Sequence, residues 1–185
     1  MGDEEIQKNI DFARKGLESA QYVYSSEICK HILLRKPGCV EAQRILQIAA
    51  KAIYDPRGFC GKVWAWVGSY IALFSAYALQ RTKRMRSLQR ALWRYPRNKV
   101  ALLLLAQCAM EDDHLDTMLF VYEELHLLFP KDMRFALALG GAYLNFGDYK
   151  SALNLGEKLL KDDPSNTEAM GLVETAALAQ VKVVK

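Results

Sequence analysis

Apolar residues recur along most of this chain with the spacing of an amphipathic helix. The pattern is clear in residues 40–53 and 82–95, where Leu88 and Ala91 fall in phase in the second segment. Polar stretches such as residues 129–132 interrupt it with a proline that stops one helix and a side chain that caps the next. This alternation predicts an all-α chain of short antiparallel helices, each of which buries one apolar stripe against its neighbours.

A 34-residue period organises these helices, because Pro96, Pro130 and Pro164 stand 34 residues apart. Small and bulky residues recur in a fixed order between the prolines. In residues 133–166 these positions hold Leu139, Gly140, Tyr143, Ala152 and Pro164. In residues 99–132 they hold Leu105, Ala106, Ala109, Tyr122, Leu125 and Pro130. The pattern resembles the tetratricopeptide repeat family, which implies a right-handed α-solenoid of antiparallel helix pairs.

The resemblance implies one repeat domain over residues 1–185. It would comprise repeat 6–39, an interrupted repeat 40–98, repeats 99–132 and 133–166, and a capping helix over 167–181. The interval from Pro37 to Pro96 is 59 residues, well beyond one period, and the excess predicts an extra helix at about 63–80. An alternative frame makes 65–78 a first helix and leaves 40–53 without its partner helix. In both frames the chain has one helix more than whole repeats need.

The extra segment 63–80 contains no charged residue, and three interpretations of it stay open. It could be buried on every face, or it could span a bilayer at the lower limit of length. It could also lie exposed and dock on an anionic membrane, on a partner or on a second copy of the chain. Flanking aromatic and basic side chains favour docking. The candidate docking residues are Trp64, Trp66, Arg81, Lys83, Arg84, Arg86, Arg90 and Arg94.

The net charge of +4 conceals an uneven distribution. Residues 56–110 carry ten basic and no acidic side chains, whereas residues 111–185 carry seven basic and thirteen acidic ones. A positive band favours an anionic partner. Because no recognised nucleic-acid-binding module accompanies it, we expect that nucleic acid is not the partner.

The cysteines and histidines lack the spacing of a metal site or of a nucleophile with its base. We expect free thiols at Cys29, Cys39, Cys60 and Cys108. The scattered histidines are His31, His114 and His126. We therefore expect no catalytic residues, no metal and no cofactor, and hence no enzyme. The first residues lack the basic and apolar regions of a secretory signal, which predicts a cytoplasmic location or, alternatively, membrane association on the cytoplasmic side.

The resemblance also implies a concave groove lined by the first helix of each repeat. The groove residues would be Val100, Leu103, Gln107, Met110, Arg134, Leu137, Gly141 and Leu144. They are mainly apolar, so a helical or extended apolar peptide is the expected ligand, although they could equally cover the chain's own extra helix. The leading interpretation is a non-catalytic protein-interaction or scaffold module. The alternative is a peripheral membrane adaptor that docks through helix 63–80 and the basic run 81–99.

Overall fold

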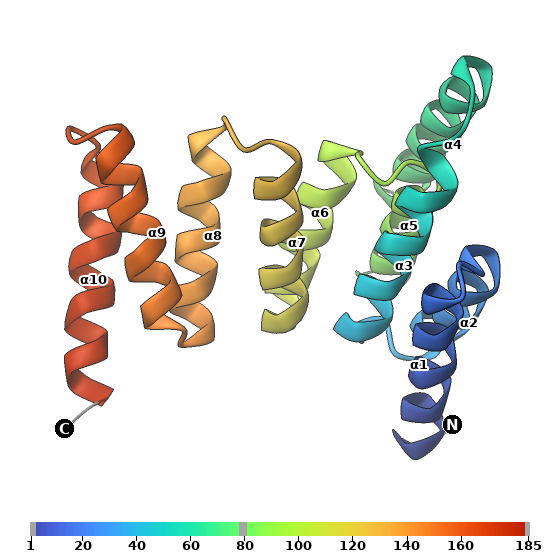
Figure 1. The fold of residues 1–185 in the computed structure, drawn as a ribbon, viewed down its shortest axis with the longest axis horizontal. Helices are drawn as coiled ribbons and strands as arrows, with labels where there is room; N and C mark the ends of the chain where they lie inside the picture. Colours follow the sequence, from blue (N-terminus) through green and yellow to red (C-terminus); the bar gives the residue numbers. More distant parts are fainter. Residues whose placement is uncertain (1–2, 78–80, 184–185) are drawn as a thin grey trace. The chain divides into compact units, whose positions relative to one another are not determined.

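The computed structural model describes residues 3–77 and 81–183, and every regular element in these ranges is an α-helix. The helices in chain order are α1 Asp3–Glu18, α2 Tyr22–Arg35, α3 Val40–Tyr54, α4 Phe59–Tyr77, α5 Arg81–Arg94, α6 Lys99–Glu111, α7 Leu115–Leu128, α8 Met133–Phe146, α9 Tyr149–Asp162 and α10 Thr167–Val183 (Figure 1). The predicted all-α helical repeat is confirmed. Helices α6, α8 and α10 begin at 99, 133 and 167, and α5, α7 and α9 begin at 81, 115 and 149, so each series repeats every 34 residues.

Loop side chains determine where several helices begin. Asn98, Asp148 and Asn166 each accept a hydrogen bond from the backbone N–H three residues later, at 3.1, 3.1 and 2.9 Å. Helix α8 ends at Gly147, whose φ of +86° lies in the left-handed region that favours glycine. The extra helix expected at about 63–80 corresponds to α4, which begins earlier, at Phe59, and residues 78–80 lie outside the described residues; α10 covers the expected capping helix 167–181.

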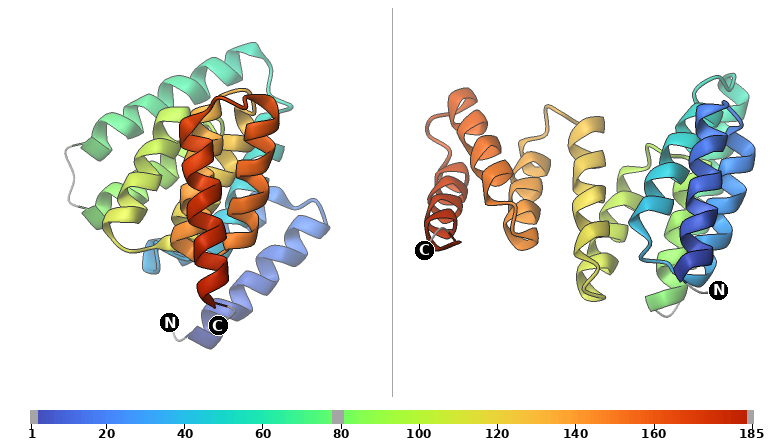
Figure 2. Two further views of the ribbon diagram at one scale, coloured as in Figure 1. Left: turned by 90° about the vertical axis from the view of Figure 1, so that its left-hand side faces the viewer. Right: turned by 60° about the horizontal axis from the view of Figure 1, so that its bottom comes forward.

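The chain divides into two compact units, residues 1–117 and 118–185. In the first unit, α1, α2 and α3 pack around a core to which Ile10, Cys29 and Ile32 contribute. Helix α5 packs against α3, α4 and α6, and α4 lies along α5 (Figure 2). The proposed boundaries of the individual repeats within one domain stay a prediction.

Glutamine side chains connect the helices of the first unit through loop carbonyls. The Nε2 atoms of Gln43 and Gln89 both donate to the carbonyl oxygen of Pro37, each at 2.8 Å. Gln47 Nε2 donates to the carbonyl oxygen of Pro96, also at 2.8 Å. These are buried or partly buried contacts, and losing one would leave a loop carbonyl without its partner. They hold α5 in position against α3 and its preceding loop.

In helix α4 the buried residues are mostly small, and the exposed residues are mostly large and apolar. Ala65, Ser69, Ala72 and Leu73 are buried, and Ser69 Oγ accepts a hydrogen bond from Asn98 Nδ2 at 2.8 Å. The exposed residues on the other side, which we call the outer α4 face, are Phe59, Val63, Trp64, Trp66, Tyr70, Ile71 and Phe74. The interpretation of this helix as buried on every face is therefore wrong.

The membrane-spanning interpretation finds no support in the described part of the chain. None of the helices there combines the length and the apolarity needed to cross a bilayer.

In the second unit, α10 packs against α9 and α8, and two glycines allow close approach. A Cβ atom at Gly140 would overlap Leu172 Cδ2, and one at Gly156 would lie 2.6 Å from Val173 Cγ2. Small residues thus let large apolar side chains of α10 pack directly on the backbones of α8 and α9. Close approach at Gly140 agrees with its place among the small residues of the repeat pattern.

Candidate binding pocket

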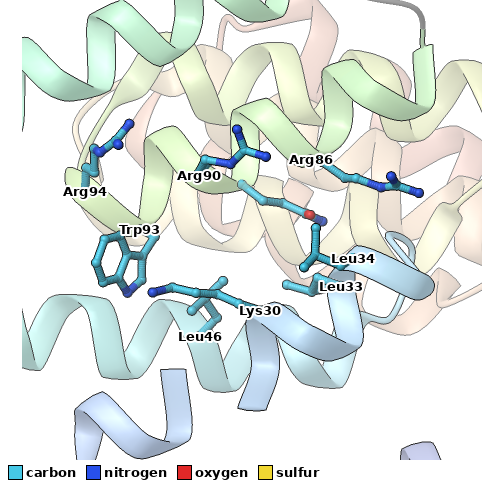
Figure 3. A pocket seen from close by; sticks show the side chains of 9 residues that line it. Lys30, Leu33, Leu34, Leu46, Arg86, Arg90, Trp93 and Arg94 are labelled. Atoms are coloured by element: carbon cyan, nitrogen blue, oxygen red, sulfur yellow. The ribbon is translucent and has the colours of Figure 1, made fainter. Parts of the chain in front are cut away.

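A pocket of about 320 Å³ opens in the first unit between α2, α3 and α5 (Figure 3). Its lining combines basic side chains with apolar ones and contains no Asp, Glu, His or Cys. The lining residues are Lys30, Leu33, Leu34, Leu46, Arg86, Gln89, Arg90, Trp93 and Arg94.

Helix α5 supplies the basic side of the pocket. Arg86, Arg90 and Arg94 follow one another at intervals of four residues, so they share one helical face. Leu88 and Ala91 lie on the opposite face and are fully buried. The core contacts therefore hold the helix while its three guanidinium groups line the opening (Figure 3).

Leucines of α2 and α3 form the apolar side of the pocket. Leu33 and Leu46 are buried within the core of the first unit, whereas Leu34 is 49% exposed. Trp93 packs partly against the same core. An apolar surface continuous with the core is rigid, and it would gain free energy when a ligand covers Leu34.

Lys30 is held between two partners at the edge of the pocket. Its Nζ lies 3.3 Å from the centroid of the Trp93 ring, a cation–π contact, and 2.7 Å from Glu27 Oε1. The contact orders both the lysine and the indole. The pocket is thus largely formed before a ligand arrives.

Several donors in the pocket have no acceptor. Arg86 Nε and Trp93 Nε1 are buried and make no hydrogen bond in the described part of the chain. No carboxylate among the described residues pairs with Arg86 or Arg90. Arg94 Nη1 donates to the carbonyl oxygen of Gly68 in a long bond of 3.4 Å. Arg90 is exposed and Arg86 is half-buried, so an anionic group at the pocket could accept charge-assisted hydrogen bonds from their guanidinium groups.

The nearby thiols are not nucleophiles. Burial, and then the proximity of Cys39, raises the pKa of Cys29 to about 12. Burial also raises the pKa of Cys108. Both thiols are therefore protonated near neutrality and lack the thiolate that attacks a substrate. The pocket can bind an anion beside an apolar group, and its lining offers no general base.

The structure separates the predicted docking residues. Arg86, Arg90 and Arg94 line the pocket, whereas Trp64 and Trp66 belong to the outer α4 face. The aromatic and basic residues that are neighbours in sequence therefore do not form one continuous surface. They belong to two surfaces of the same unit.

The remaining basic residues of that set lie elsewhere. Lys83 is exposed and does not line the pocket. Arg84 forms a side-chain hydrogen bond with Cys108, on the other side of α5 from the pocket. The side chain of Arg81 lies outside the described residues.

The predicted groove residues fall in both units. Val100, Leu103, Gln107 and Met110 share the exposed face of α6 in the first unit. Arg134, Leu137, Gly141 and Leu144 lie along α8 in the second unit and are exposed or half-buried. Asp132 binds the Arg134 guanidinium through two hydrogen bonds of 2.9 Å. That the two sets form one groove stays a prediction.

The sequence analysis missed the α2 and α3 side of the pocket. The four-residue spacing of Arg86, Arg90 and Arg94 could have identified the basic face of α5. No local pattern brings Lys30 or Leu46 to that face, because the approach depends on how α5 packs against α3.

No protein-family model matches this sequence, and no curated protein matches it. Among solved structures, the chain is similar to a crystal structure of MamA protein, with 16% identity over 97% of this chain and 84% of the other, and a TM-score of 0.47. It is also similar to a mutant of MamA, with 14% identity over 94% of this chain and 87% of the other, and a TM-score of 0.44. Similarity at these values shows nothing about function, which we infer below from the pocket alone.

Proposed function

We propose that this protein is a non-catalytic interaction module that binds a segment of another protein in the pocket between α2, α3 and α5. The observation that supports this is a pocket lining that combines Arg86, Arg90 and Arg94 with a leucine surface and contains no acidic side chain. A ligand that fits must bring acceptors and apolar atoms together.

A protein segment with acidic and aliphatic side chains meets both requirements. Glutamate or aspartate can accept two parallel hydrogen bonds from an arginine fork. Leucine or a similar side chain would cover Leu34, which is half exposed in the free chain. An amphipathic helix or an extended strand can present the two kinds of side chain at the spacing of a pocket wall.

The predicted groove residues of α6 are a separate part of this proposal. Leu103 and Met110 remain exposed on α6, and they would bind a mainly apolar segment. A cytoplasmic location stays a prediction as well.

A binding experiment with the full chain tests the pocket. The probe is a fluorescently labelled synthetic helix that carries leucine and glutamate on one face, followed by anisotropy at increasing salt. We expect salt-sensitive binding that weakens about tenfold or more with Arg86→Gln plus Arg90→Gln, because hydrogen bonds to charged groups are the strong ones.

Two controls make the result specific. The matched variant Lys83→Gln removes an exposed charge from the same helix outside the pocket, and it should leave the affinity nearly unchanged. A second peptide with glutamine in place of glutamate should bind weakly. Equal affinity for both peptides, or equal losses in all variants, would overturn the proposal.

A further inference from the structure

The outer α4 face is a second surface with the exposed apolar character of a binding interface. Phe74, Phe59 and Trp64 are 84%, 83% and 76% exposed. Their positions, with Val63, Trp66, Tyr70 and Ile71, fall within one broad stripe of the helix at three- and four-residue spacing. No charged residue interrupts this stripe.

The arrangement within α4 is the reverse of a usual surface helix. A helix that only completes a core buries its large apolar residues and exposes polar ones. Helix α4 instead packs with Ala65, Ser69 and Ala72 against the rest of the unit and exposes its aromatic residues. Contiguous exposed apolar surface of this kind marks a contact with a protein or a membrane.

Cations lie along the margins of the outer α4 face. Arg94, which also lines the pocket, reaches the carbonyl oxygen of Gly68. Lys62 lies 5.8 Å above the ring of Tyr54, near the opposite margin. All ten charged side chains of residues 56–110 are positive. The charges that α4 and its neighbours in residues 56–110 bring to this face are therefore all positive.

We propose that the outer α4 face binds the surface of an anionic membrane, with α4 lying parallel to the bilayer plane. Tryptophan and tyrosine rings favour the boundary between headgroups and acyl chains, and Trp64, Trp66 and Tyr70 supply them. Basic residues beside that boundary bind anionic headgroups.

A second copy of the chain fits this face less well. Pairing two outer α4 faces would bring two sets of positive side chains together without a carboxylate from residues 56–110 of either copy. A lipid surface supplies negative charge and apolar volume at once. The proposal shares only Arg94 with the pocket, because Arg86 and Arg90 take no part in it.

Vesicle flotation of the full chain tests the proposal. The probes are vesicles of phosphatidylcholine alone and of phosphatidylcholine mixed with phosphatidylglycerol, each at low and high salt. We expect flotation with the mixed vesicles at low salt and a blue shift of tryptophan emission. Trp64→Glu plus Phe74→Glu should abolish flotation, and Lys62→Gln should weaken partitioning about fivefold.

Matched variants in the second unit control for apolarity and charge. Leu178 is 66% exposed on α10, and Lys161 is exposed on α9. Leu178→Glu and Lys161→Gln should float like the original chain. Circular dichroism and the pocket-binding assay verify that each variant is folded.

Three outcomes would overturn the proposal. The chain could remain unbound with mixed vesicles at low salt, or Trp64→Glu plus Phe74→Glu could leave flotation unchanged. The third outcome is a dimer in analytical ultracentrifugation that Trp64→Glu dissociates, without vesicle binding, because it would assign the face to a second copy.

Discussion

The two units of this chain solve the same packing problem in different ways. In the second unit, Gly140 and Gly156 let Leu172 and Val173 pack onto helix backbones. In the first unit, where the extra helix interrupts the repeat, glutamine and asparagine side chains hold helices through hydrogen bonds to residues 29 to 52 positions away. Close backbone packing is thus prominent in the regular unit, and polar contacts to loop carbonyls are prominent in the interrupted one. The pocket and the outer α4 face, for which we propose ligands, both lie in the interrupted first unit.

The stabilities of the two units can be measured separately, because all three tryptophans of the chain lie in residues 1–117. Tryptophan fluorescence reports unfolding of the first unit, and far-ultraviolet circular dichroism reports both. A variant that damages one unit should separate the two signals.

The largest effect is expected from Gly140→Val. The added side chain would overlap Leu172, which is buried, so the second unit should lose about 3 kcal/mol of stability. In chemical denaturation, the circular dichroism transition should move and the fluorescence transition should not.

The control for this variant is its neighbour. A Cβ atom at Gly141 meets nothing within 4 Å, so Gly141→Ala should raise helix stability by about 0.5–1 kcal/mol. If both variants destabilise the second unit alike, close packing at Gly140 is not what holds it.

Asn98→Ala should have the next largest effect, this time in the first unit. Asn98 is buried, caps α6 and donates to Ser69 Oγ, so its loss should cost about 2 kcal/mol. The fluorescence transition measures this loss. Ser69→Ala removes only the second contact and should cost about half as much. Equal costs would mean that the cap contributes nothing.

The smallest effect concerns the cap of α9 and depends on pH. The hydrogen bonds from Ser151 hold the pKa of Asp148 below its ordinary value of 3.8. Because the folded-state pKa is depressed, the carboxylate contributes stability above 3.8, and this contribution is lost as the pH falls through the folded-state pKa.

Denaturation against pH checks the sign. Asp148→Ala should cost about 1 kcal/mol at neutral pH. Asp148→Asn keeps the cap without the charge, so its stability should fall less on acidification than that of the original chain. Parallel curves for the two would exclude a contribution from this carboxylate.

Much of the fold follows from local signals. The helical spacing of apolar residues such as Leu88 and Ala91 predicted a helix at 82–95, and the structure has α5 at Arg81–Arg94. Full burial, one of the three interpretations of the extra helix, was wrong because it considered the lack of charge without regard to residue size. The small residues Gly61, Ala65, Ser69 and Ala72 already indicate a single inward face.

Only the α5 side of the pocket could be predicted from the sequence. The spacing of Arg86, Arg90 and Arg94 is visible in the sequence, whereas Lys30 lies more than fifty residues before them. No periodicity connects such distant positions, since their approach depends on tertiary packing around the loop that holds Pro37.

The hydrogen bond from Gln89 to Pro37 also bears on folding kinetics. It joins residues 52 positions apart, and the bond from Gln47 to Pro96 joins residues 49 apart. Closing such long loops costs entropy before any contact compensates for it, and this slows folding. Adjacent helices of the second unit can associate without that cost. The pocket therefore forms late, and a fragment that begins after α3 would carry the arginines of α5 but not the binding site.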